Sequence, residues 1–220
     1  MEYDIQVKIC GITREEDASA CVSLGVDAIG LVFYPPSSRH VSREQARCIT
    51  KLIPGHILTV GVFVDESAET VKTIVEYCGL RAVQLHGVES PSTAEAIKKM
   101  NVKVIKAIFM NGTPEPSEMV NYNVDAFLLE APQGPIPGGT GMRWDWSLVK
   151  NLSRSYPVIL AGGLNPENVT EAINASLTDA VDVSSGVESA PGIKDIDKVS
   201  RFIKSVKSCS FHTTRRILYG

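Results

Sequence analysis

Eight short runs of apolar and mostly β-branched residues recur along this chain of 220 residues, about 27 residues for each run. The segments between them have the apolar spacing of helices and often begin with helix-start residues such as Thr13 and Asn165. A unit of about 27 residues fits one strand, one helix and two short loops. The runs are Ile5 to Cys10, Ala28 to Phe33, Ile57 to Val64, Ala82 to His86, Val102 to Ile108, Asp125 to Glu130, Val158 to Ala161 and Ala180 to Ser184.

These runs are apolar on both faces instead of alternating, which is typical of parallel strands buried on both sides. Eight strand and helix units in succession predict an α/β fold, a (β/α)₈ TIM barrel, as a single domain over residues 1–207. An open doubly wound sheet is the alternative. That sheet would place a Gly-x-Gly-x-x-Gly turn after the first strand, but here the glycine turns follow the seventh and eighth runs, which favours the barrel.

Charge and composition restrict the partners of the chain. With 22 basic and 25 acidic side chains the net charge is −3, and 44% of the residues are apolar. A disordered chain is excluded, and the lack of a lysine and arginine run argues against nucleic acid or an anionic membrane as the main partner. We therefore expect a small-molecule ligand, and the oligomeric state is left open.

Two segments lie outside the repeating pattern. Residues 131–141 are rich in proline and glycine, follow the sixth run and are expected to form a lid on the catalytic face of the barrel. Residues 208–220 include Arg215 and Arg216 but have no continuing helical period. We expect this segment to be a loosely ordered tail.

The sequence also bears on location and on metals. The longest apolar runs are far shorter than the roughly 18 residues that a membrane-spanning helix needs, and the N-terminal residues lack the pattern of a signal peptide, so a cytoplasmic protein is expected. The five cysteines and four histidines are scattered. Neither a disulfide framework nor a metal site is expected from such spacing.

A barrel enzyme carries its site at the C-terminal ends of its strands, so the residues that end the runs are the candidates. The seventh run leads into Gly162 and Gly163, and the eighth into Ser184, Ser185 and Gly186. Small residues allow backbone N–H groups to approach an anion closely, and these two loops are the usual phosphate site of the barrel. The alternative is that the glycines only satisfy tight turns.

Cys10 ends the first run and Arg39 follows the second. A thiolate at a strand end would face the substrate and could act as a base, although a cysteine can equally be a small buried apolar residue. The guanidinium of Arg39 could hold a planar carboxylate through paired hydrogen bonds, the alternative being a solvated surface arginine.

Gln84 and His86 end the fourth run, and strand alternation places both on the same side, where they could contact one ligand. A core histidine bonded to backbone is the alternative for His86. Glu130 ends the apolar sixth run. A carboxylate there is costly to bury without a role, so Glu130 is the candidate acid, with a structural ion pair as the alternative.

Taken together, in order and at these spacings, the motifs resemble those of the phosphoribosylanthranilate isomerase family of tryptophan biosynthesis. The resemblance covers the chain up to about residue 207. The segments that carry it are Lys8-Ile9-Cys10-Gly11, Ser38-Arg39-His40-Val41, Val60-Gly61-Val62-Phe63-Val64, Val83-Gln84-Leu85-His86-Gly87, Gly138-Gly139-Thr140-Gly141, Ala161-Gly162-Gly163-Leu164 and Asp182-Val183-Ser184-Ser185-Gly186-Val187-Glu188.

The resemblance implies a (β/α)₈ barrel and a cofactor-free Amadori rearrangement of N-(5-phosphoribosyl)anthranilate, with Cys10 as general base. The family's general acid is an aspartate at the end of strand six, and here Glu130 stands in that place. Arg39 would hold the anthranilate carboxylate, and the two glycine loops the phosphate. Two alternatives stay open: another phosphosugar-processing barrel enzyme, or a non-catalytic phosphosugar-binding barrel if Glu130 cannot replace the aspartate.

Overall fold

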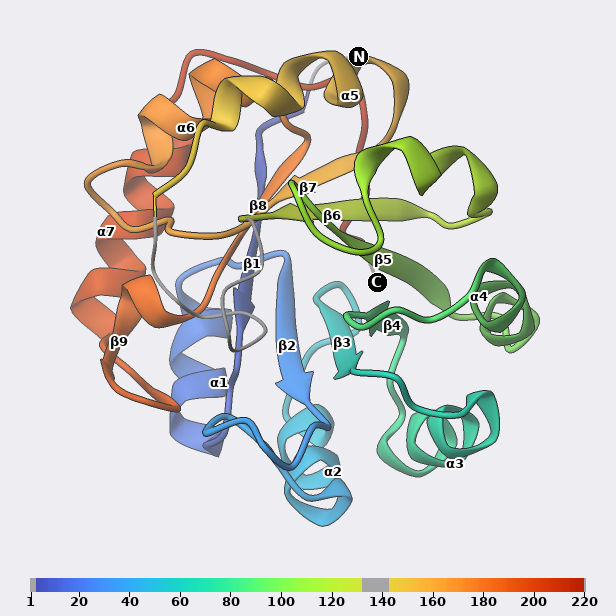
Figure 1. Cartoon of the computed structure of the whole chain (residues 1–220). Coiled ribbons are helices and arrows are strands. Elements are labelled where there is room, and N and C mark those ends of the chain that lie inside the picture. Colours follow the sequence, from blue (N-terminus) through green and yellow to red (C-terminus); the bar gives the residue numbers. More distant parts are fainter. Residues whose placement is uncertain (1–2, 132–142, 220) are drawn as a thin grey trace.

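The computed structural model describes residues 3–131 and 143–219, and within them eight parallel strands form one closed barrel (Figure 1). Each strand pairs with the next along the chain, and β8 pairs with β1, with Val7 opposite Val181. The predicted α/β class and (β/α)₈ barrel are therefore confirmed. The strands are β1 (Gln6–Cys10), β2 (Ala28–Val32), β3 (Leu58–Phe63), β4 (Ala82–Leu85), β5 (Lys103–Phe109), β6 (Ala126–Glu130), β7 (Val158–Leu160) and β8 (Ala180–Val183).

Helices follow the strands and surround the barrel (Figure 1). Three of them begin where a serine side chain accepts a hydrogen bond from the backbone N–H three residues later: Ser42 before α2, Ser67 before α3 and Ser90 before α4. The α-helices are α1 (Glu15–Ser23), α2 (Arg43–Lys51), α3 (Ala68–Cys78), α4 (Pro91–Lys98), α5 (Lys150–Ser155), α6 (Val169–Ser176) and α7 (Ile196–Lys207).

Shorter elements complete the fold. The segment after β5 departs from the expected repeat, since it forms only the 3₁₀ helix η1 (Pro116–Asn121). Gly112, Pro114 and Pro116 are poor α-helix formers, and they crowd the short stretch before β6. The remaining short elements are the 3₁₀ helices η2 (Trp146–Val149) and η3 (Ser185–Val187), and the antiparallel pair β9 (Glu188–Ala190) and β10 (Ile193–Lys194).

The barrel interior is apolar on most strands and polar on β1. Leu58, Val60, Ile105 and Leu128 belong to the apolar cluster inside the barrel. On β1 the alternate residues Gln6, Lys8 and Cys10 share a face, and all three are buried. The inner face of β1 therefore carries polar groups from one end of the barrel to the other.

The tail after α7 is not loosely ordered as the sequence analysis expects. Leu218 is 1% exposed and belongs to the apolar cluster inside the barrel. Its backbone N–H donates to Oε1 of Gln6, and its carbonyl accepts from Nε2 of the same side chain. Arg215 donates to the carbonyls of Ser153 and Tyr156. The tail is held by these contacts, which join it to Gln6 at the N-terminal end of β1 and to the segment before β7.

Two further expectations from the sequence concern the lid segment and membrane-spanning helices. Nearly all of the segment expected to act as a lid, residues 132–141, lies outside the described residues, as does the glycine motif 138–141. Among the described residues, no helix combines the length and the apolar character needed to cross a membrane.

Candidate active site

One pocket lies at the C-terminal ends of the strands, and every candidate residue selected from the sequence lines it. The selected residues on its wall are Cys10, Arg39, Gln84, His86, Glu130, Gly162, Gly163, Ser184, Ser185 and Gly186. Residues that the sequence analysis did not select also line it, among them Tyr34, Ser37 and Asp182. The selected residues come from six of the eight strand ends, and Val62 and Val64 at the end of β3 also line the pocket.

Cys10 lies directly above a buried ion pair. The ammonium of Lys8, two residues earlier on the same strand face, is 2.9 Å from Oδ2 of Asp182 on β8. Gly30 on the neighbouring strand makes room for both groups, because a Cβ there would lie 2.7 Å from Sγ of Cys10 and 3.2 Å from Nζ of Lys8. Alternation along β1 is the sequence signal that could have linked Lys8 to the candidate base.

The ion pair acts on the thiol in two directions. Burial raises the pKa of Cys10 above its ordinary value, the positive charge of Lys8 works against this, and the negative charge of Asp182 adds to it. For Lys8, burial is the largest single effect and opposes the ammonium, but the charges and hydrogen bonds of Asp182 and Cys10 together outweigh it and raise the pKa, so the lysine stays charged. Lys8 is therefore the nearby cation that favours the thiolate.

Gln84, His86 and Glu130 form a connected row across the pocket. Nε2 of Gln84 lies 3.0 Å from Nδ1 of His86, and Nε2 of His86 lies 3.1 Å from Oε2 of Glu130. The imidazole also packs edge-on against the ring of Phe109. The carboxyl group of Glu130 is thus oriented by the imidazole, which is itself fixed from its other nitrogen.

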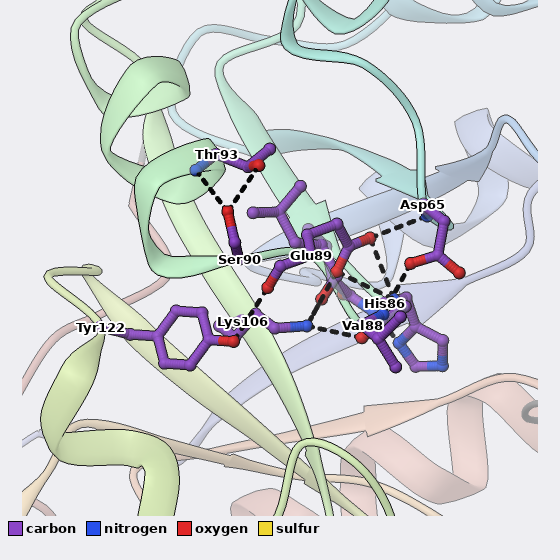
Figure 2. Close-up of polar contacts among 11 residues, drawn as sticks. Asp65, His86, Val88, Glu89, Ser90, Thr93, Lys106 and Tyr122 are labelled. Carbon is purple, nitrogen blue, oxygen red and sulfur yellow. Dashed lines mark hydrogen bonds and ion pairs between the residues drawn. The ribbon is translucent and has the colours of Figure 1, made fainter.

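The loop that carries His86 is fixed from below by a second buried ion pair (Figure 2). Nζ of Lys106 lies 2.8 Å from Oε2 of Glu89, and Oε1 of that carboxylate accepts from the backbone N–H of Asp65 and of Gly87. Lys106 also donates to the carbonyl of Gly87 at 2.7 Å. Sequence reasoning missed this pair, although a lysine inside an apolar run such as Val104-Ile105-Lys106-Ala107 is the signal for a buried charge.

Arg39 reaches across the pocket wall to the segment after β8. Its Nε and Nη2 donate to the two carboxylate oxygens of Glu188 at 2.8 and 2.7 Å. Lys194, completely buried, donates to the same carboxylate at 2.8 Å. Arg39 is therefore not a solvated surface arginine, the alternative considered from the sequence.

The loops after β7 and β8 have the backbone that an anion site needs. Gly162 and Gly163 adopt positive φ values of 84° and 70°, which favour glycine. A Cβ on Gly186 would overlap the carbonyl oxygen of Leu164. Small residues at these positions keep the backbone N–H groups open to the pocket, as the sequence analysis expects of a phosphate site.

Three buried polar atoms on this pocket have no hydrogen-bond partner within the part of the chain that the structure describes: Oε1 of Gln84, Oδ1 of Asp182 and Oγ of Ser184. Buried polar atoms are normally paired, and the amide and carboxylate oxygens among these three can only accept hydrogen bonds, so their gathering in one pocket indicates a ligand that carries hydroxyl groups. In residues 3–131 and 143–219, no group of three or more metal-binding side chains occurs.

Comparison with known proteins identifies the family. A family model described as N-(5'phosphoribosyl)anthranilate (PRA) isomerase matches residues 7–205. The chain belongs to the PRA isomerase family. It is thus an isomerase of tryptophan biosynthesis, as the resemblance of its motifs implies.

Relatives and solved structures agree with the PRA isomerase family. The chain is 45% identical over 202 residues to N-(5'-phosphoribosyl)anthranilate isomerase of Desulfatibacillum aliphaticivorans, covering 92% of this chain and 93% of that one. The crystal structure of the enzyme from Thermotoga maritima matches with a TM-score of 0.85 and 41% identity, covering 92% of this chain and 98% of that one. Another PRA isomerase structure, with a TM-score of 0.81, 40% identity and the same coverages, is a complex with reduced 1-(o-carboxyphenylamino)-1-deoxyribulose 5-phosphate.

Proposed function

We propose that this chain converts N-(5'-phosphoribosyl)anthranilate to 1-(2-carboxyphenylamino)-1-deoxyribulose 5-phosphate, with Glu130 as general acid and Cys10 as general base. The observation that carries the proposal is that a thiol, a carboxyl, a guanidinium and two glycine loops line one pocket. The substrate has a carboxylate at one end and a phosphate at the other, and this pocket offers a group for each.

The acid step opens the ribose ring. Glu130 donates a proton to the furanose oxygen, the lone pair of the anthranilate nitrogen forms a C=N bond, and the C–O bond of the ring breaks to give an iminium ion. His86, 3.1 Å from Glu130, orients the carboxyl for this transfer. Because an acid must hold its proton before the step, Glu130 acts in its protonated form.

The base step moves the proton at C2′. The iminium ion acidifies that C–H bond, so the thiolate of Cys10 can remove the proton and leave an enolamine, which tautomerises to the ketone. Lys8 supports the ionised thiol from beneath. Both steps are proton transfers by side chains, so the proposed mechanism calls for no cofactor or metal.

Binding at both charged ends would hold the reacting carbons between the acid and the base. Arg39 would take the anthranilate carboxylate. Backbone N–H groups of Gly163, Ser185 and Gly186 would take the phosphate, with the hydroxyl of Ser184 beside them. Gln84 would bind a ribose hydroxyl through its unpartnered carbonyl oxygen.

The test is a fluorescence assay that follows consumption of N-(5'-phosphoribosyl)anthranilate by the purified chain and by Cys10→Ala. We expect turnover by the parent and a loss of roughly 10² to 10⁴-fold in kcat for the variant, the usual effect of removing a general base. Binding of the phosphosugar without turnover by the parent would favour the non-catalytic barrel. Turnover of a different phosphosugar in its place would favour another barrel enzyme.

The same pocket supports a proposal about partners and location. The guanidinium of Arg39, the serine hydroxyls and the glycine backbone on its wall suit a small phosphorylated molecule, and the net charge of −3 gives no basis for binding nucleic acid. A biosynthetic enzyme with such a substrate is expected to work in the cytoplasm. Cell fractionation with an antibody to the chain would test this location.

A further inference from the structure

We propose that Glu188, held in place by Lys194, is a positioning residue that turns one edge of Arg39 toward the pocket and so sets the preference for a substrate with a carboxylate. The inference rests on the proposed role of Arg39 as the carboxylate-binding group. It concerns residues that line no part of the proposed reaction path, since neither Glu188 nor Lys194 contributes to the pocket wall.

The guanidinium of an arginine has two edges that can each hold a carboxylate through a pair of N–H groups. In this chain the side edge, formed by Nε and Nη2, is occupied by Glu188 at 2.8 and 2.7 Å. Nη1 makes no hydrogen bond to any of the described residues, and Arg39 lines the pocket. The edge formed by Nη1 and Nη2 is therefore the one left for a ligand.

Glu188 is itself fixed from several directions. Nζ of Lys194 donates to its Oε1 at 2.8 Å, and Nζ of Lys198 donates to its backbone carbonyl at 2.8 Å. The backbone N–H of Lys194 donates to Asp17, which joins the β9–β10 hairpin to α1. Because the carboxylate of Glu188 is held in place, it fixes the orientation of the guanidinium of Arg39.

The charges of this cluster leave a positive balance. Arg39 and Lys194 share one carboxylate, so one positive charge is not compensated within the three residues. Burial is the largest single effect and would raise the pKa of Glu188, but the hydrogen bonds and charges of Arg39 and Lys194 together outweigh burial and lower it. Glu188 stays ionised at neutral pH, and the remaining positive charge attracts an anionic group on the substrate.

Arg39 also lies close to the proposed base. The stem of its side chain crosses the backbone of Gly11, the residue after Cys10, where a Cβ would lie only 2.6 Å from Cδ of Arg39 and 3.0 Å from Oγ of Ser184. In addition, Nζ of Lys194 lies 3.3 Å from the carbonyl of Ser184, in the proposed phosphate loop. One cluster thus sets the position of the carboxylate site relative to both the base and the phosphate site.

The experiment measures the dissociation constants of two ligands by calorimetry: reduced 1-(o-carboxyphenylamino)-1-deoxyribulose 5-phosphate and the analogue with a plain phenyl ring. The proteins are the parent, Glu188→Gln, Arg39→Ala and the double variant. Glu167→Gln is the matched control, because Glu167 pairs with Arg201 on the surface. Thermal unfolding and binding of inorganic phosphate show whether each variant is folded.

We expect Glu188→Gln to raise the dissociation constant of the carboxylated ligand by about tenfold, the scale of one charge-assisted contact. The dissociation constant of the phenyl analogue should rise by less than about twofold. Arg39→Ala and the double variant should bind the carboxylated ligand equally weakly, because Glu188 acts through Arg39. In kinetics, Glu188→Gln should raise KM and leave kcat nearly unchanged. Glu167→Gln should leave the dissociation constants of both ligands unchanged.

Two outcomes would overturn the inference. Equal weakening of both ligands by Glu188→Gln would mean a purely structural role, and additive losses in the double variant would mean that Glu188 does not act through Arg39. A different result would reject the role of Arg39 itself: Arg39→Ala binding the carboxylated ligand as tightly as the parent does. The two failures are therefore distinguishable.

Discussion

The ammonium of Lys8 and the carboxylate of Asp182 lie 2.9 Å apart inside the barrel, on the face of β1 that also carries Cys10. Lys8 is 0% exposed, so its charge has no access to water and acts on its neighbours through a poorly screening interior. The two partners affect the thiol in opposite senses, since Lys8 lowers its pKa and Asp182 raises it. Because the two effects are opposite in sign, substitutions of Lys8 and of Asp182 can serve as controls for each other.

We expect Lys8→Met to shift the pH profile of kcat/KM to higher pH, and Asp182→Asn to shift the thiol titration to lower pH. Burial already raises the pKa of Cys10 above its ordinary value, and loss of the lysine charge, which lowers that pKa, raises it further. The measurement is the rate of thiol alkylation against pH, made in a Cys48→Ser background because Cys48 is exposed.

Removing either charge also leaves the other buried alone, which lowers stability in both variants. A general loss of stability would move the two alkylation profiles in the same direction or not at all. Opposite shifts are therefore specific to the electrostatic effect on Cys10, and parallel shifts would contradict it.

Glu130→Gln should lose at least about tenfold in kcat, because the amide keeps the shape of the side chain but has no acidic proton to deliver. Glu130→Asp should retain activity or exceed the parent, since it restores the family's residue at this strand end. Steady-state kinetics with N-(5'-phosphoribosyl)anthranilate measure both. A Gln variant as active as the parent would place the acid elsewhere, with Asp182 as the next candidate.

Gly186→Ala should raise the inhibition constant of inorganic phosphate, a competitive inhibitor, by about tenfold or more. The Cβ of the new alanine would overlap the carbonyl of Leu164 and displace the loop. Gly79→Ala is the matched control. A Cβ on Gly79 would meet nothing within 4 Å, and Gly79 follows α3 with no part in the pocket wall. Its φ of 66° makes any side chain there strained, so this control tests the effect of a lost glycine without a clash in the loop. The control should lose some stability, by about 1 kcal/mol, and keep its inhibition constant.

Leu218→Ala should lower the free energy of unfolding by about 2–5 kcal/mol, the range for truncating a buried leucine. Leu218 is 1% exposed inside the barrel, whereas Leu148, the control, is 54% exposed. Leu148→Ala should lower the free energy of unfolding by less than about 0.5 kcal/mol. Denaturant unfolding measures both. Equal stability of the two variants would show that the tail does not contribute to the core.

The strands and their ends could be predicted because they depend on local pattern. A run such as Ala28 to Phe33 is apolar on both faces, which identifies a buried parallel strand, and the barrel rule then places strand ends on one face. Cys10, His86 and Glu130 could be selected for that reason. Each strand begins and ends within one residue of the expected run.

The supporting contacts could not be predicted because they join residues far apart in the chain. Arg39 and Glu188 are 149 positions apart, and Lys8 and Asp182 are 174 apart. No local pattern records which buried lysine meets which carboxylate. The contacts of the tail could not be predicted for a related reason. Leu218 is a single apolar residue, and Arg215 donates to backbone carbonyls, which every residue has.

The contacts of the tail also have a consequence for the order of folding. The hydrogen bonds between Gln6 and Leu218 close a loop of 212 residues, and closing so long a loop is unfavourable until the intervening chain is compact. We therefore expect these bonds to form late in folding, once the intervening chain is compact. Substitutions in the tail should then accelerate unfolding and leave the folding rate nearly unchanged, so that the lifetime of the folded barrel should depend on this short segment.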